Sequence, residues 1–190
     1  FYDHILELDF LDSLNHDHQV LLKSCLLCNN AVVRENERIG DPTELALIDL
    51  VNHHTKNDTQ FRNSAVRLSE LPFDSDRKLM SISSLKHIYT KGAPDVILKR
   101  CNQILVNGTK VPLTSHHIDC ISNMNEQYAK EGLRVLGFAY KDYEGNQINY
   151  EDEYDLTFIG LVSLMDPPRI ESHESVIKCK KAGIKPIMIT

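Results

Sequence analysis

Between residues 66 and 91 the apolar side chains alternate with polar ones, whereas neighbouring segments repeat them at helical spacing. Alternation with a period of two places every second side chain on one face, which predicts the strands of a half-buried sheet. Helices on either side of this stretch would supply the layers that cover the sheet. We therefore expect an α+β fold, an antiparallel twisted sheet flanked by helices. The predicted strands are 66–68, 79–82, 87–89, 133–140 and 157–165.

Capping and turn signals divide the rest of the chain. Asp41 is a good N-cap, Pro42 suits the first helical position and Glu44 occupies the capping-box position, so a helix begins here. Asn107-Gly108 is typical of a two-residue hairpin turn. The other predicted elements are helices over 14–30, 92–101 and 115–131, a hairpin over 31–39 and a loop over 55–64.

The two prolines of the Asp166-Pro167-Pro168-Arg169 segment interrupt this pattern. Proline cannot continue a sheet ladder and restricts the backbone, so we interpret residues 166–169 as a stiff hinge. A helix over 170–182 and an apolar strand over 184–189 follow, a unit that suits a parallel α/β sheet. The sequence thus predicts a first domain over 1–165 and part of a second over 170–190.

Charge and composition exclude several classes of protein. The net charge of −6 argues against a nucleic-acid binder, which normally carries a basic excess. No apolar run reaches the ~18 residues that a membrane span needs, and no signal peptide is visible. The chain does not start with Met, so we expect it to be a piece of a longer protein whose membrane part, if any, lies elsewhere.

The cysteines and histidines give weak signals. Five cysteines, an odd and scattered number, favour reduced thiols in the cytosol. Cys25 and Cys28 form a CxxC within an apolar helical pattern, which favours two buried thiols, with a metal or redox site as the alternative. The nine histidines show no convincing ligand spacing and are expected on solvated surface.

Standard phosphate-binding and hydrolase motifs are absent, but a group of short strings occurs in a fixed order. Together they resemble the nucleotide-binding domain of type II P-type cation-transporting ATPases, and among these they look most like calcium pumps. No single string is specific, whereas five in register are. The strings are GDPTELAL (40–47), LPFDSDRKLM (71–80), YTKGAP (89–94), GLRVL (132–136), and MDPPR (165–169) followed by IKPIMIT (184–190).

The resemblance implies that the domain binds ATP and presents its γ-phosphate to an aspartate in a DKTGT motif of the phosphorylation domain. That motif is absent here, and the chain stops before the Gly-Asp that helps to hold Mg²⁺ in the family. It further implies a parent that spans a cell membrane several times, with this domain facing the cytoplasm. The expected partners are ATP and the phosphorylation and actuator domains of the same parent. We expect the isolated chain to be monomeric, to stay out of the membrane and not to hydrolyse ATP.

Four residues follow from the resemblance as the ATP site around the predicted strands. Phe73 would stack on adenine, although from the sequence alone a core position is the better interpretation. Lys91 would line the deep end of the adenine pocket, and Gly92 lets a ligand approach the backbone closely. Lys78 would meet phosphate oxygens near the mouth, while its neighbour Arg77 points to the opposite face. A solvated surface lysine is the alternative for Lys91.

The remaining candidates carry more than one interpretation. Arg134 resembles a phosphate-contacting arginine, with a surface salt bridge as the alternative. Glu44 would accept a hydrogen bond from the adenine amino group, although the capping box explains it fully as a structural residue. Thr43 is a weaker member of the same site. Asp166 is expected at the hinge and near the phosphates once the domains dock, and Arg169 is expected to contact the neighbouring domain.

Three other interpretations stay open. The chain could serve as a protein-interaction module without nucleotide binding, or as a thiol-redox or metal protein built on Cys25 and Cys28. The parent could also transport another cation, such as Mg²⁺ or Na⁺/K⁺, since the residues that select the ion lie in membrane helices outside this chain.

Overall fold

A seven-stranded mixed sheet forms the centre of the molecule in the computed structural model, which describes residues 16–34, 37–54, 66–165 and 170–187. The strand order is β3-β4-β5-β8-β9-β6-β7, and every neighbouring pair is antiparallel except β6 and β9. The α+β prediction is confirmed, with this one parallel pair as a difference. The strands are β3 (Arg67–Asp74), β4 (Leu79–Ser84), β5 (His87–Gly92), β6 (Cys101–Val106), β7 (Thr109–Pro112), β8 (Arg134–Asp142) and β9 (Leu156–Leu164).

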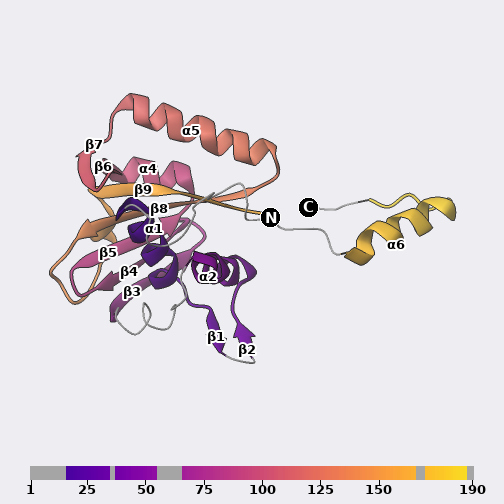
Figure 1. Cartoon of the computed structure of the whole chain (residues 1–190), viewed down its shortest axis with the longest axis horizontal. Coiled ribbons are helices and arrows are strands. Elements are labelled where there is room, and N and C mark those ends of the chain that lie inside the picture. The colour runs from indigo at the N-terminus through magenta and orange to yellow at the C-terminus, as the bar shows by residue number, and fades with distance from the viewer. Residues whose placement is uncertain (1–15, 35–36, 55–65, 166–169, 188–190) are drawn as a thin grey trace.

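Helices cover both faces of this sheet, as Figure 1 shows. The pair α1 and α2 packs on one face, where Met80, Ile82 and Tyr89 join the larger core. The pair α4 and α5 lies over the other face, where Leu79 and Phe158 join a smaller core. The bounds are α1 (His16–Leu27), α2 (Pro42–His54), α4 (Pro94–Arg100), α5 (Ser115–Lys130) and a 3₁₀ helix η2 (Tyr150–Glu153).

The local signals placed several elements correctly. A short hairpin of β1 (Val32–Arg34) and β2 (Glu37–Ile39) occupies the predicted range. Asn107 and Gly108 both have positive φ angles, 50° and 77°, as a primed two-residue turn between β6 and β7 requires. The helix predicted over 92–101 is α4, but it begins two residues later, because β5 extends to Gly92, and it ends one residue earlier, at Arg100. The strand β6 that follows it directly was not predicted.

The C-terminal segment differs from the prediction in part. The helix α6 (Ile170–Lys181) matches the predicted range. Residues 184–187 have no regular structure, although a strand was predicted over 184–189. A parallel strand needs neighbours for its hydrogen bonds, and no described strand pairs with this segment. The predicted loop at 55–64 and the hinge at 166–169 lie outside the described residues.

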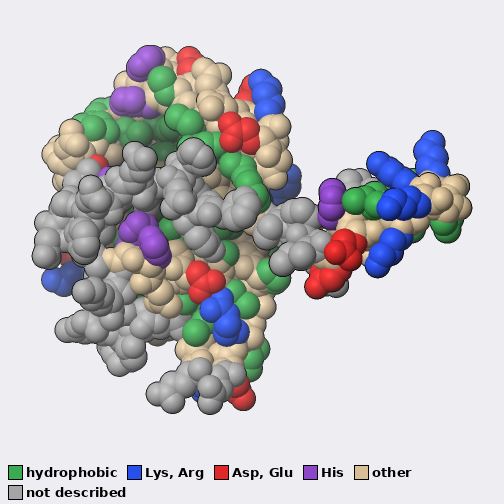
Figure 2. Space-filling model, turned by 45° about the vertical axis from the view of Figure 1, so that its right-hand side comes forward, with side chains coloured by type: hydrophobic (Ala, Val, Ile, Leu, Met, Phe, Trp, Pro, Cys, Tyr) green, Lys and Arg blue, Asp and Glu red, His purple; other side chains and the backbone are tan. Residues whose placement is uncertain are grey.

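The helix α6 lies apart from the layered body in Figure 1. Its surface carries both Lys/Arg and Asp/Glu side chains in Figure 2, including an exposed pair in which the Lys178 Nζ lies 3.8 Å from the Glu174 Oε2. Among the helices that the structure describes, none combines the length and apolar character needed to cross a lipid bilayer.

Candidate functional site

Most of the candidate residues gather at one end of the sheet, where β3 and β5 end and β4 and β8 begin. The register shows this directly, because Leu79 at the start of β4 pairs with both Asp74 and Gly92. Gly92 in turn pairs with Gly137 of β8, near Arg134 at the start of that strand. Segments far apart in the sequence therefore meet at this end.

The N-terminus of α2 lies at the same end and is capped as predicted. The Asp41 Oδ1 accepts a hydrogen bond from the Thr43 backbone N–H at 2.8 Å. Hydrogen bonds from Thr43, followed in effect by the positive charge of Arg134, hold the pKa of Asp41 below its usual value. The Thr43 Oγ1 accepts a bond of 2.8 Å from the Arg134 guanidinium, so helix α2 and strand β8 are joined here.

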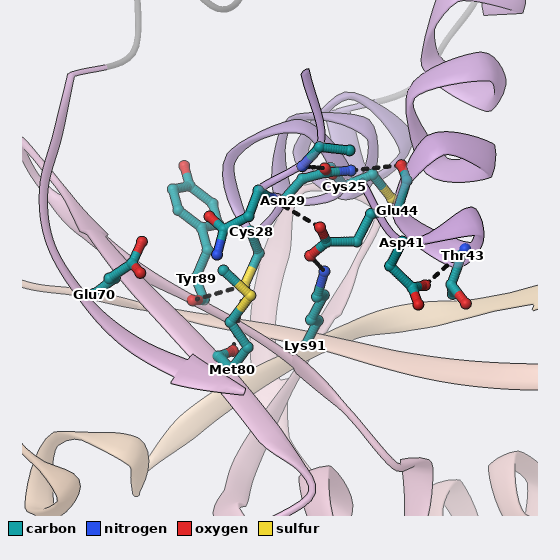
Figure 3. Close-up of polar contacts among 12 residues, drawn as sticks. Cys25, Cys28, Asn29, Asp41, Thr43, Glu44, Glu70, Met80, Tyr89 and Lys91 are labelled. Atoms are coloured by element: carbon teal, nitrogen blue, oxygen red, sulfur yellow. Dashed lines mark hydrogen bonds and ion pairs between the residues drawn. The ribbon is translucent and has the colours of Figure 1, made fainter. Parts of the chain in front are cut away.

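Lys91 and Glu44 form a largely buried ion pair beneath the start of α2. The Lys91 Nζ donates to the Glu44 Oε1 at 2.7 Å, with side-chain exposures of 9% and 16%. The other carboxylate oxygen of Glu44 accepts from the Asn30 backbone N–H at 3.1 Å. Figure 3 shows the Lys91 side chain rising from the sheet toward Glu44, and it also labels Asp41 and Thr43 at the start of the same helix. These described bonds link Glu44 to the sheet and to the α1–β1 connection, beyond the local capping box that the sequence suggested.

Gly92 and Lys78 are locked together through the backbone. The Lys78 carbonyl accepts the Ala93 N–H at 3.1 Å, and a Cβ on Gly92 would lie 2.2 Å from that carbonyl oxygen. Lys78 itself has a φ of 54°, a left-handed conformation that is uncommon for residues with side chains. The glycine is therefore required for the close approach of the turn to the end of β5.

The turn between β3 and β4 leaves most of its side chains exposed, with Arg77 as the exception. The Asp74 Oδ1 accepts from the Asp76 and Arg77 N–H groups at 2.9 and 2.8 Å, and these bonds lower the pKa of Asp74, chiefly the one from Arg77. Phe73 is 61% exposed at the end of β3, so the core interpretation of this ring is wrong. Lys78 is also exposed.

The predicted site residues are thus brought together in pairs: Glu44 with Lys91, Thr43 with Arg134, and Lys78 with Gly92. Phe73 joins them by its place on β3, one residue before Asp74, whose partner is the start of β4. Asp166 and Arg169 lie outside the described residues. Their position in the chain follows Met165, directly after β9 ends beside Arg134.

Sequence reasoning missed the partners that hold this site. Asn30 bonds to Glu44, and Glu153 bonds to Arg77, from which it is separated by 76 positions in the chain. No local signal marks either Asn30 or Glu153. Strand alternation does not explain the direction of the Arg77 side chain, because Arg77 and Lys78 both lie in the turn between β3 and β4. This side chain points toward Glu153, on the face of the sheet opposite to Lys91.

Cys25 and Cys28 are fully buried in the larger core. Burial raises the pKa of the Cys28 thiol to about 11 and that of Cys25 higher still, although the nearby Lys91 ammonium acts in the opposite direction on both. The Cys28 thiol donates to the Met80 carbonyl at 3.2 Å. A protonated, enclosed thiol is a poor nucleophile and a poor metal ligand.

We expect iodoacetamide to label Cys25 and Cys28 in the native chain more than about 100-fold more slowly than Cys120, because alkylation needs a thiolate and an opened core. Cys120 is exposed on α5 and serves as the internal control. Time-resolved mass spectrometry would measure the rates, and denaturant should make all five cysteines react. Rapid labelling of both core thiols would instead favour the redox or metal interpretation.

In the portions of the chain that the structure describes, no group of three or more His, Cys, Asp or Glu residues is arranged to hold a metal ion. The polar groups at the site consist of two lysines, an arginine, a glutamate, an aspartate and a threonine. They suit an anionic, hydrogen-bonding ligand better than a bare cation.

Comparison with known proteins supports the resemblance to P-type ATPases that the sequence motifs indicated. The family model for the cytoplasmic domain N of P-type ATPases matches residues 17–171. A calcium-transporting ATPase of Listeria monocytogenes is 37% identical over 177 residues, covering 90% of this chain and 20% of that protein. Calcium-transporting ATPase 1 of Lactococcus lactis is 39% identical over 189 residues, covering 96% of this chain and 22% of that protein.

More distant pumps also match. The alpha-A subunit of a sodium/potassium-transporting ATPase from Artemia franciscana is 35% identical over 169 residues, covering 80% of this chain and 17% of that subunit. The chain therefore spans about a fifth of the length of the curated relatives it matches. Because the family match covers most of the chain and includes every candidate residue, the chain belongs to the cytoplasmic N domains of the P-type ATPases.

Proposed function

We propose that this domain binds ATP and presents the γ-phosphate to an aspartate in another domain of the same parent protein. The observation that carries the proposal is the meeting of Lys91, Lys78 and Arg134 at one end of the sheet. In a chain with a net charge of −6, an anion must be attracted by such a local cluster. The N-terminus of α2 adds its partial positive charge.

Each residue has a distinct role in this proposal. The exposed Phe73 ring would stack on the adenine, and Lys91 would line the inner end of the pocket. The Lys91–Glu44 pair would orient the Glu44 carboxylate, whose acceptor lone pairs suit the adenine amino group. The exposed Lys78 and the Arg134 guanidinium would guide the phosphates, since a flexible ammonium and a planar fork both bind phosphate oxygens.

The parent protein's activity is part of the proposal. Calcium transport is the printed function of several relatives, and we propose a P-type cation pump, with calcium as the favoured ion, whose membrane part lies outside this chain. Magnesium would be held mainly by the phosphorylation domain together with the triphosphate. This chain would contribute binding and positioning, which accelerate phosphoryl transfer to an aspartate by bringing the reactants together.

The domain boundaries are proposed as well. Residues 1–165 would form the nucleotide-binding unit, 166–169 a hinge, and 170–190 the start of the phosphorylation domain. The separate position of α6 and its largely exposed surface support this division. Asp166 would come near the phosphates when the hinge closes, because β9 ends at the same end of the sheet as the site.

An ATP titration followed by amide NMR shifts tests the proposal. We expect a dissociation constant on the order of 0.1–1 mM, because few groups would contact the nucleotide and the described residues include no cluster of metal ligands. Phe73→Ala should weaken binding by about 10-fold, since a base stacked on an aromatic ring contributes about 1–3 kcal/mol. The shifts should centre on residues around Phe73 and Lys91.

Leu85→Ala is the matched control. Leu85 is 63% exposed, much like Phe73, but it lies in the β4–β5 turn at the opposite end of the sheet. The Leu85→Ala variant should bind ATP as tightly as the unsubstituted chain does. Absence of any shift at millimolar ATP would reject nucleotide binding. ATP binding that is insensitive to Phe73→Ala would instead reject the stacking role.

A further inference from the structure

Glu153 is a fully buried carboxylate on the face of the sheet opposite to Lys91. It lies on the 3₁₀ helix η2 and has no exposed surface. The Arg77 Nη1 donates to both of its oxygens, at 2.6 and 2.7 Å, and the Ser81 hydroxyl donates to Oε1 at 2.6 Å. The Arg100 Nη1 lies 3.7 Å from Oε2. A buried carboxylate is tolerated only with such compensation.

Arg77 also holds the β3–β4 turn, which carries two of the proposed ATP contacts. Its Nη2 donates to the Pro72 carbonyl at 2.7 Å, immediately before Phe73 in the chain. Its guanidinium carbon lies 4.9 Å from the centre of the Tyr150 ring, so the planar group is held on a further side. One side chain therefore ties the residue before Phe73 to an anchor in the protein interior.

Lys78 follows Arg77 directly and is restrained from the other direction. Its left-handed backbone and its carbonyl bond to Ala93 fix where the turn returns to β4. Ser81, which binds Glu153, also lies 2.9 Å from the Thr90 hydroxyl, so the anchor reaches β5 one residue before Lys91. The network thus runs under the site without entering it.

We propose that Arg77, anchored on Glu153, is a positioning residue that orders the β3–β4 turn before ATP arrives. This inference rests on the proposed nucleotide site. Arg77 points away from the Lys91 face, so it acts through Phe73 and Lys78 rather than by contacting the nucleotide. A turn held in its binding conformation has less entropy to lose when the ligand docks.

Arg77→Lys tests the proposal because lysine keeps the charge but cannot bind two carboxylate oxygens and a carbonyl together. We expect the dissociation constant for ATP to rise about 10-fold, in proportion to the lost preorganisation. In the Phe73→Ala background the same substitution should raise it by less than about 3-fold, since residues acting through one another are not additive. Equal effects in both backgrounds would indicate a general structural role and overturn the proposal.

Glu153→Gln attacks the other partner and should weaken ATP binding in the same direction, with thermal unfolding used to confirm that the variant folds. Glu151→Gln is the matched control, because Glu151 is exposed on the same 3₁₀ helix. It should leave ATP binding unchanged. ATP binding by Arg77→Lys within twofold of the parent chain would contradict the positioning role.

Hydrogen exchange without nucleotide separates this inference from the proposed function. In the unsubstituted chain the backbone N–H groups of residues 77 and 78 both bond to Asp74. Arg77→Lys should speed hydrogen exchange at these two amides by at least about 10-fold. If the unsubstituted chain binds no ATP, the proposed function fails. Unchanged exchange in the turn would show that Arg77 does not order it, whatever the chain binds.

Discussion

Replacing Lys91 with Met is expected to lower the free energy of unfolding by about 3 kcal/mol, because it leaves the Glu44 carboxylate in a largely buried position without its cation. The pair has a single direct bond of 2.7 Å, and its side chains are only 9% and 16% exposed. The Asn30 N–H still compensates one carboxylate oxygen, which limits the loss. Binding of ATP should weaken at least about 10-fold, because the substitution removes the charge that we propose for the inner end of the adenine pocket.

A second substitution separates stability from binding. Lys91→Met combined with Glu44→Gln removes both charges, and we expect it to regain most of the lost stability while ATP binding stays weak. Denaturant unfolding and NMR titration would measure the two effects. Lys130→Met is the control, since its Nζ lies 3.8 Å from Glu126 in an exposed pair that should contribute less than about 0.5 kcal/mol. Recovery of ATP binding in the double variant would show that neither charge contacts the nucleotide.

The fold was predictable where the signal is local. Asp41 and Pro42 favour a helix start, because the Asp41 side chain caps a free backbone N–H and Pro42 has no N–H that needs a partner. The structure has α2 there. Asn107-Gly108 tolerates positive φ angles, and the turn follows. The same turn implies a hairpin, but no local signal indicates that β6 also pairs in parallel with β9, whose partner residues lie more than 50 positions later in the chain. Partners at such distances are chosen by tertiary packing rather than by local propensity.

The site residues likewise divide into those that the sequence indicated and those that only the structure revealed. By itself a phenylalanine is more typical of a core, whereas the polar residues that follow Phe73 and the resemblance to P-type ATPases together favoured a place in the site. The structure leaves the ring exposed. The Glu44–Lys91 pair joins residues 47 positions apart and arises from the packing of α2 on β5. Glu153 lies 76 positions from Arg77 and has no sequence signature. The motifs therefore gave the residues that we propose to face the ligand, whereas the residues that hold them in place emerged only from the fold.

Gly92→Ala is expected to destabilise the chain by about 2–3 kcal/mol, the cost of forcing extra volume into a packed site. The added Cβ would lie 2.2 Å from the Lys78 carbonyl oxygen and 2.6 Å from the Leu79 Cδ2. The leucine side chain can rotate, but the carbonyl is fixed by the Ala93 N–H and belongs to a residue already at a φ of 54°. The backbone of the turn must therefore move, and with it Lys78 and the Phe73 strand end.

ATP affinity should fall together with stability for this reason, by about 10-fold or more if the turn is displaced by the order of 1 Å. Gly160→Ala on β9 is the matched control, since its Cβ would meet Leu21 at 3.6 Å, an ordinary van der Waals distance. That variant should unfold within about 1 kcal/mol of the parent chain, because alanine suits a strand interior at least as well as glycine. If Gly92→Ala matched Gly160→Ala in both stability and ATP binding, the contact between the turn and the end of β5 would not shape the site. A loss of stability with unchanged ATP affinity would place Lys78 and Phe73 outside the binding surface, since both must shift when the turn does.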